Sequence, residues 1–132
     1  MGIERDLVLY LKAQLSDTGI FEGGFAERPD NQTTVIHFGG EASEREMGAS
    51  LSTPPMEIPL VLVMARSKDK TVALTRAQAA YAKLDNLQGM TSTGGIVYLH
   101  AESLDGPPSL LEQDGNLRWV YGSTYRIKKA AG

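Results

Sequence analysis

The sequence predicts a single α+β domain in which two helices pack on one mixed or antiparallel sheet. The chain has 132 residues, the usual size of one domain built around one core. Two segments space their apolar residues as amphipathic helices do. The other segments include short runs rich in β-branched and aromatic residues, bounded by turn residues. The predicted order is helix, two strands, a long loop, strand, helix and three strands.

The first element is predicted to be a helix over residues 3–15. Its apolar residues recur at helical spacing, and Gly19 follows as a break. Residues 20–26 and 33–38 then form a predicted hairpin around the turn at 28–31. The apolar face of the helix consists of Ile3, Leu7, Tyr10, Leu11 and Leu15.

Residues 39–55 show neither a helical nor a strand period. The segment contains tandem glycines, prolines and several acidic residues. A structureless stretch of this length is uncommon inside a compact domain, and it is often functional or disordered. We therefore predict one long flexible loop.

A buried central strand is predicted next, because residues 59–65 are continuously apolar, as in a strand covered on both faces. Asp69 is a suitable N-cap for a second helix over residues 70–88, and Gly89 is a suitable residue to end it. Many alanines allow this helix to lie close to a sheet. Its apolar face consists of Ala73, Ala77, Ala80, Tyr81, Leu84 and Leu87.

The rest of the chain is predicted to form strands at residues 96–101, 109–113 and 117–127. A turn at 114–116 joins the last two strands, and the tail at 128–132 is predicted to be loose. Alternate residues of the last strand share one side. These residues are Trp119, Tyr121, Ser123, Tyr125 and Ile127.

Composition excludes several classes of protein. The chain has no cysteine, which excludes disulfides and thiolate metal sites. Its 13 basic and 16 acidic residues give a net charge of −3, whereas a general nucleic-acid binder usually shows a basic excess. No apolar run is long enough to span a bilayer, so no membrane partner is expected.

No catalytic apparatus is recognisable. His37 and His100 both lie in predicted strands without further ligands at metal-binding spacing. Ser67 and Lys70 match the S-x-x-K spacing of some acyl enzymes, but the companion motifs are missing. We therefore expect no enzyme activity, no cofactor and no metal.

Two clusters have two interpretations each. Glu41, Glu44 and Glu46 could act as paired carboxylates in acid–base chemistry, or they could be a solvated loop or an interface. We favour the loop or interface, because catalytic carboxylates need rigid placement. The aromatic residues at 119–125 could stack on single-stranded nucleic acid, but core plus interface is favoured, because aromatic residues are enriched in both.

A family resemblance rests on the order of several segments. A buried strand, Pro59-Leu-Val-Leu-Val-Met-Ala-Arg66, precedes Asp69 and the alanine-rich helix. Gly95-Ile-Val-Tyr98, Pro107-Pro-Ser-Leu-Leu111 and Asp114-Gly-Asn-Leu-Arg-Trp-Val120 follow. This order resembles the small tail-terminator proteins of long-tailed bacteriophages, which are also described as minor capsid or head–tail joining proteins.

The resemblance implies a hexameric ring that caps the finished tail tube, stops its polymerisation and joins the head. The implied partners are other copies of the chain, the tail tube protein and a head completion or connector protein, while DNA passes through without specific binding. The implied location is the head-proximal end of the tail, after assembly in the host cytoplasm. Ring closure needs head-to-tail contacts, and the long final strand is a candidate edge for them.

Surface considerations, not the resemblance, suggest which residues contact other subunits or the tube. These are Glu41, Glu44, Arg45, Glu46, Met47, Arg66, Arg118, Trp119, Tyr121 and Tyr125. The alternative function is a small ferredoxin-like domain that binds a ligand or regulates. An enzyme that uses Glu41, Glu44 or His100 is the third hypothesis.

Overall fold

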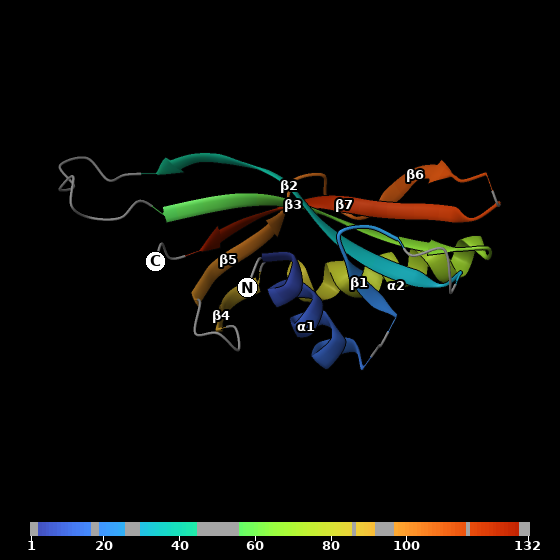
Figure 1. Ribbon diagram of the computed structural model, residues 1–132, viewed down its shortest axis with the longest axis horizontal. Helices are drawn as coiled ribbons and strands as arrows, with labels where there is room; N and C mark the ends of the chain where they lie inside the picture. Colours follow the sequence, from blue (N-terminus) through green and yellow to red (C-terminus); the bar gives the residue numbers. More distant parts are fainter. Residues whose placement is uncertain are drawn as a thin grey trace.

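The computed structural model describes residues 3–16, 19–25, 30–44, 56–85, 87–91, 97–115 and 117–129. Both helices cover the same face of a seven-stranded mixed sheet, which confirms the predicted α+β class and the order of the predicted elements (Figure 1). The helices are α1 (Ile3–Leu15) and α2 (Lys70–Leu84). The strands are β1 (Ile20–Glu22), β2 (Gln32–Glu44), β3 (Met56–Ser67), β4 (Leu87–Thr91), β5 (Val97–Ser103), β6 (Ser109–Gln113) and β7 (Trp119–Lys129).

The last strand lies in the middle of the sheet. The strand order is β1-β2-β3-β7-β5-β4, and β6 also pairs with β7. β3 pairs with β7 from Ser67↔Trp119 to Glu57↔Lys129. On its other side, β7 pairs first with β6 and then with β5. The expectation that the final strand is a free edge is therefore wrong, because both of its sides are already paired within the subunit.

The predicted hairpin at the start of the sheet is also wrong. β1 and β2 run parallel, with Ile20 opposite Thr33 and Glu22 opposite Val35. Gly23 and Gly24 have positive φ angles of 78° and 132°, so the chain leaves β1 in a conformation that glycine adopts readily. The positive φ angles of these two glycines set the direction in which the chain leaves β1, while residues 28 and 29 of the predicted turn lie outside the described residues.

The second helix ends earlier than predicted, at Leu84. Its C-cap is Asp85, whose extended backbone donates its N–H to the Tyr81 carbonyl at 2.8 Å. The Asp85 carboxylate accepts the Ser103 N–H at 3.1 Å, which ties the helix end to β5. Gly89 is therefore not a helix terminator and lies in β4, a strand that the sequence pattern did not reveal.

The predicted loop at 39–55 begins too early. The backbone at residues 39–44 continues β2 and pairs with β3, from Gly39↔Leu60 to Glu44↔Met56. β7 likewise continues to Lys129, so the predicted loose tail does not begin at residue 128. Residues 45–55 and 130–132 lie outside the described residues.

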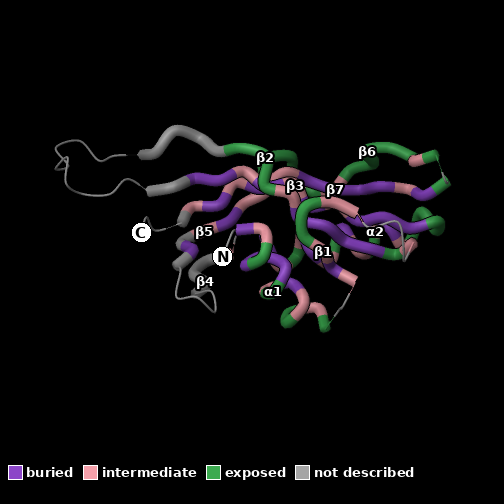
Figure 2. Tube along the Cα trace, in the orientation of Figure 1, coloured by how far each residue is buried: buried purple, intermediate pink, exposed green. Residues whose placement is uncertain are grey.

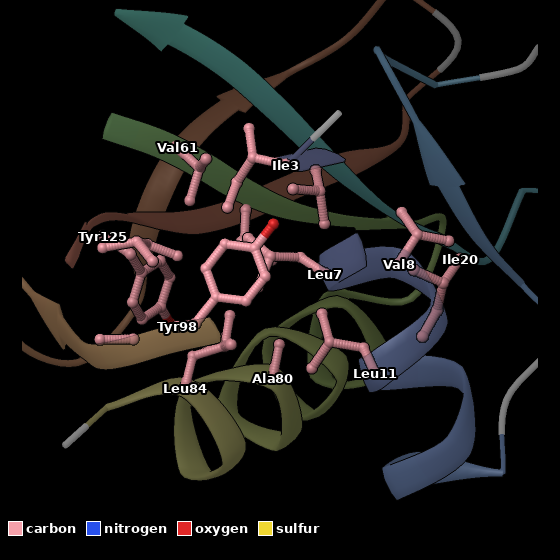
Figure 3. Packing of buried hydrophobic residues seen from close by; sticks show 14 residues of the cluster. Ile3, Leu7, Val8, Leu11, Ile20, Val61, Ala80, Leu84, Tyr98 and Tyr125 are labelled. Carbon is pink, nitrogen blue, oxygen red and sulfur yellow. The ribbon is translucent and has the colours of Figure 1, made fainter. Parts of the chain in front are cut away.

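The core fills the space between the helices and one face of the sheet. Leu7 and Leu11 of α1 and Leu84 of α2 are fully buried there (Figure 3). Alanine side chains on α2 permit close packing on the sheet, because Ala73 and Ala80 are also fully buried. The purple of Figure 2 runs along the central strands and the inner faces of the helices.

Candidate assembly surface

Strand β6 is exposed to solvent along its whole length. All of its residues from Ser109 to Gln113 are exposed, although it forms a ladder with β7. Leu110 and Leu111 expose 46% and 45% of their surfaces. The register shifts between Leu110 and Glu112, which makes Leu111 a β-bulge residue. This short strand therefore carries two leucines that find no cover within the described part of the chain.

The turn between β6 and β7 exposes a third leucine. Leu117 has a φ of 61° and an exposed fraction of 69%, the largest among the large hydrophobic residues described. Its N–H donates to the Asp114 carbonyl at 3.0 Å. Asp114 also accepts the Arg118 N–H at 3.0 Å and the Arg118 Nε–H at 2.8 Å through its carboxylate. The turn is therefore held in a defined shape by one aspartate.

Two buried arginines meet at Asp30, and one of them, Arg118, links this turn to the body of the subunit. Arg66 and Arg118 expose only 4% and 7% of their surfaces. An Arg118 terminal nitrogen lies 3.5 Å from the Asp30 carboxylate, and Arg66 Nε donates to the Asp30 carbonyl at 3.4 Å. Arg66 also lies 4.7 Å from the centroid of the Phe25 ring. Burial, followed by the nearby Arg118 charge, lowers the pKa of Arg66.

The aromatic residues of β7 belong mainly to the core. Tyr121 and Tyr125 expose 7% and 1% of their surfaces, and burial raises the pKa of Tyr125. Trp119 is partly buried beside Ala65 and Ala73, and Lys70 Nζ lies 5.1 Å from its ring centroid. The core interpretation of Tyr121 and Tyr125 is confirmed, and no open stacking platform is formed by these side chains.

The acidic residues predicted for the interface stay a prediction. Glu41 and Glu44 lie on the backbone of β2, while Arg45, Glu46 and Met47 lie outside the described residues. The backbones of Glu41 and Glu44 pair with Ile58 and Met56 of β3.

The residues considered for chemistry have other contacts. Ser67 donates its hydroxyl to Asn31 Oδ1 at 2.6 Å, and Lys70 is the residue over Trp119. The backbone N–H of exposed His37 donates to Glu4 at 2.7 Å. Within the described ranges, no group of three or more metal-ligating side chains occurs. An open pocket is lined by Asp30, Asn31, Ser67, Lys68, Asp69 and Val72.

The exposed leucines were missed because the sequence-based prediction looked for charges and aromatic residues. The available signal was Leu110-Leu111, two adjacent apolar residues in a short strand, where a strand with one covered face would alternate. A leucine inside the polar turn at residues 114–118 was the second signal.

Comparisons with known proteins identify solved structures that have the same fold. A scan against protein-family models gives no match, and a search of curated proteins gives none either. A chain from the virion of a native gene transfer agent particle is 12% identical, with a TM-score of 0.63, covering 98% of this chain and 95% of that chain. A second solved chain, whose name states no function, is 12% identical with a TM-score of 0.60, covering 98% and 91%. None of the described helices is both long and apolar enough to cross a membrane. At these identities the comparisons show a shared fold: this chain has the fold of a chain in the gene transfer agent virion.

Proposed function

We propose that this chain is a structural protein of a phage-like particle, located in the virion. The observation that carries the proposal is the end-to-end structural match with a chain of the gene transfer agent virion. That match covers nearly all of both chains, so it concerns the whole fold rather than one common motif. The exposed leucines on β6 and in the turn that follows it also favour a protein that contacts other proteins.

Within such a particle, the proposed role is that of a tail terminator. The chain forms a hexameric ring on the last ring of the tail tube, stops polymerisation and presents its other face to a head completion protein. The support is the length and element order of the resemblance, together with exposed apolar residues on two separate strands, Phe38 on β2 and the leucines on β6, since ring closure needs two different contact surfaces. The net charge of −3 suits a ring through which DNA slides without binding. The role is structural and uses no cofactor.

Purified tail tubes test the proposed role. The chain is added to polymerising tube protein, and tube length and end structure are measured by electron microscopy. Terminator function predicts shorter tubes with a ring at one end. Thr75→Ala, on an exposed position of α2, serves as a matched control and should cap tubes normally. Tubes of unchanged length with bare ends would count against the terminator role. A saturable thermal shift with a small metabolite, acting at the pocket beside Asp30 and Asn31, would favour the ligand-binding alternative.

A further inference from the structure

The first helix places a carboxylate beside the outer edge of β2. Glu4, in the first turn of α1, is partly buried, and its Oε2 accepts the backbone N–H of His37 at 2.7 Å. Ile3 and Leu7 of the same helix are buried in the core and fix the position of this turn. The helix dipole also favours an acidic side chain in the first turn. The contact joins residues far apart in the sequence, so the fold determines it.

The N–H of His37 points to the side of β2 on which β1 lies. Thr33 donates its N–H to the Gly19 carbonyl at 2.9 Å. The Val35 carbonyl accepts the Gly23 N–H, also at 2.9 Å. Backbone groups on one edge of a strand recur at every second residue, so His37 continues this series. The ladder between β1 and β2 ends at Val35, and β1 therefore offers no partner to the His37 N–H.

The Glu4 carboxylate takes the position in which β1 would have continued. Gly23 leaves the ladder with a positive φ, and the N–H of Gly24 then donates to the Thr34 hydroxyl at 2.9 Å rather than to the backbone of β2. A Cβ added to Gly23 would lie 3.8 Å from Glu4 Oε1, so the carboxylate lies beside the point where the chain departs. It therefore replaces the carbonyl that a longer β1 would have offered to His37.

Beyond His37, none of the described strands lies on the outer edge of β2. Residues 37–44 pair with β3 on their other side. An unpaired edge is a template for another strand, and natural proteins block such edges with charged side chains, prolines or bulges. Residues 36–40 contain no Asp, Glu, Lys, Arg or Pro, and the register shift at Phe38 is the interruption nearest to His37. Glu4 therefore supplies from α1 a charge that this part of β2 lacks.

We propose that Glu4 is an edge guard, a side chain that prevents the β2 edge of a free subunit from pairing with the same edge of another copy. Every free subunit carries this edge, and two identical edges can form a closed two-fold pair. The edge guard acts on the free subunit, so it does not depend on the proposed tail-terminator role.

The strength of the Glu4 contact explains how one side chain can block the edge. An incoming strand would offer a neutral carbonyl to His37, whereas a charge-assisted hydrogen bond is about twice as strong as a neutral one. The carbonyl oxygens of that strand would also approach the negative charge of Glu4, which is unfavourable. Pairing that continues the β1 position along β2 must therefore first displace the carboxylate.

Amide hydrogen exchange measures whether Glu4 protects the edge. Glu4→Ala removes the acceptor, so the His37 amide should exchange roughly tenfold faster, as expected for the loss of a charge-assisted hydrogen bond. Glu4→Gln keeps an acceptor oxygen without the charge and should give an intermediate rate. The Thr33 amide, bonded to Gly19, is the internal control and should keep its rate. An unchanged rate for His37 in Glu4→Ala would overturn the proposal.

Light scattering measures whether this protection limits self-association. At equal concentration, the mass of Glu4→Ala should rise above that of the wild type, toward about twice its value for a two-fold pair. Adding Phe38→Lys at this 54% exposed position should return the mass to the wild-type value, because a lysine on an edge blocks strand pairing. Arg5→Ala, which breaks the exposed pair of α1 with Glu22 at 3.8 Å, is the matched control and should leave the mass unchanged.

Three results would contradict the edge guard. The first is an unchanged mass for a folded Glu4→Ala. The second is an equal increase in mass for Arg5→Ala, which would assign the association to loosening of α1. The third is an increase that Phe38→Lys does not reverse, which would place the association on another surface. Melting temperatures show whether each variant is folded, and Glu4→Gln provides both comparisons, with smaller expected changes, where Glu4→Ala unfolds.

Discussion

At the scale of single residues, the least expected group is a carboxylate in the apolar core. Asp6 exposes 3% of its surface and accepts a hydrogen bond from the Tyr98 hydroxyl, which is also buried. Its other oxygen, Oδ1, has no hydrogen-bond partner in the described part of the chain. Leu7, next to Asp6, belongs to the same core as Tyr98 (Figure 3). A buried polar group with few partners is costly, so the Tyr98–Asp6 hydrogen bond between β5 and α1 offsets much of that cost.

We expect Tyr98→Phe to lower the free energy of unfolding by about 1–3 kcal/mol, because the Asp6 carboxylate loses its donor. Asp6→Leu with Tyr98→Phe should recover much of that loss, since no polar group is then left without a partner. Urea unfolding of the two single variants and the double variant measures the coupling. Strictly additive losses would contradict this account of the pair.

At the scale of elements, the central pairing of β3 with β7 depends on one glycine. A Cβ added to Gly122 would lie 2.5 Å from the Val63 carbonyl oxygen and 3.1 Å from Met64 Cα. Both neighbours are backbone atoms, so a side chain at this position cannot be accommodated by changing a rotamer. The two strands can approach this closely only because residue 122 has no side chain.

Gly122→Ala should therefore destabilise the fold by roughly 1–3 kcal/mol, the usual range for overpacking. A drop in melting temperature of several degrees is expected for a domain of this size. Thr124→Ala, two residues along the same strand and partly exposed, is the matched control and should change stability far less. An unchanged melting temperature for Gly122→Ala would show that β3 and β7 can move apart enough to fit a methyl group without loss of stability.

A second element-scale contact joins β5 to β7 by charge. Glu102 and Arg126 are opposite each other in the register, and Arg126 Nε donates to Glu102 at 2.9 Å. The hydrogen bond from Arg126 is the main cause that lowers the pKa of Glu102. A carboxyl group whose pKa is lower when folded stabilises the fold above its unfolded pKa, and this contribution disappears as pH falls through the folded value.

Glu102→Gln should consequently be less stable than the wild type at neutral pH. The difference should shrink as the pH falls below 4.5, the ordinary value for this group, and vanish in more acidic solution. Unfolding curves at a series of pH values measure it, with Glu112→Gln on exposed β6 as the control. A stability difference between Glu102→Gln and the wild type that stays constant down to acidic pH would exclude the charge of Glu102 as its cause.

Sequence patterns predicted the features that depend on residues close in the sequence. They failed where contacts between residues far apart in the sequence determine the structure. Asp69 was identified as an N-cap, and its side chain does accept the Thr71 N–H. The end of α2 was misplaced because Asp85 is held by Ser103, a residue on another strand. For the same reason, Arg66 and Arg118 were assigned to the surface, since their shared partner Asp30 is remote in the sequence.

At the scale of the whole molecule, the larger hydrophobic cluster joins all layers. α1, α2 and the central strands contribute to it, whereas a smaller second cluster joins α2 to β3 and β7 without α1. The class of the fold was predictable because it follows from periodicity, which every segment carries locally. The pairing partners of each strand were less predictable. β5 and β6 both pair with β7, and the residue pattern of neither strand indicates this partner. The exposed leucines gain meaning only at this scale, where the position of β6 is known.

The central place of β7 has a consequence for the folding rate. β3, β5 and β6 all pair with this strand, and Glu57 pairs with Lys129 although much of the chain lies between them. Pairing between residues so far apart in the sequence must close large loops first, which slows folding. We therefore expect the centre of this sheet to form later than either helix.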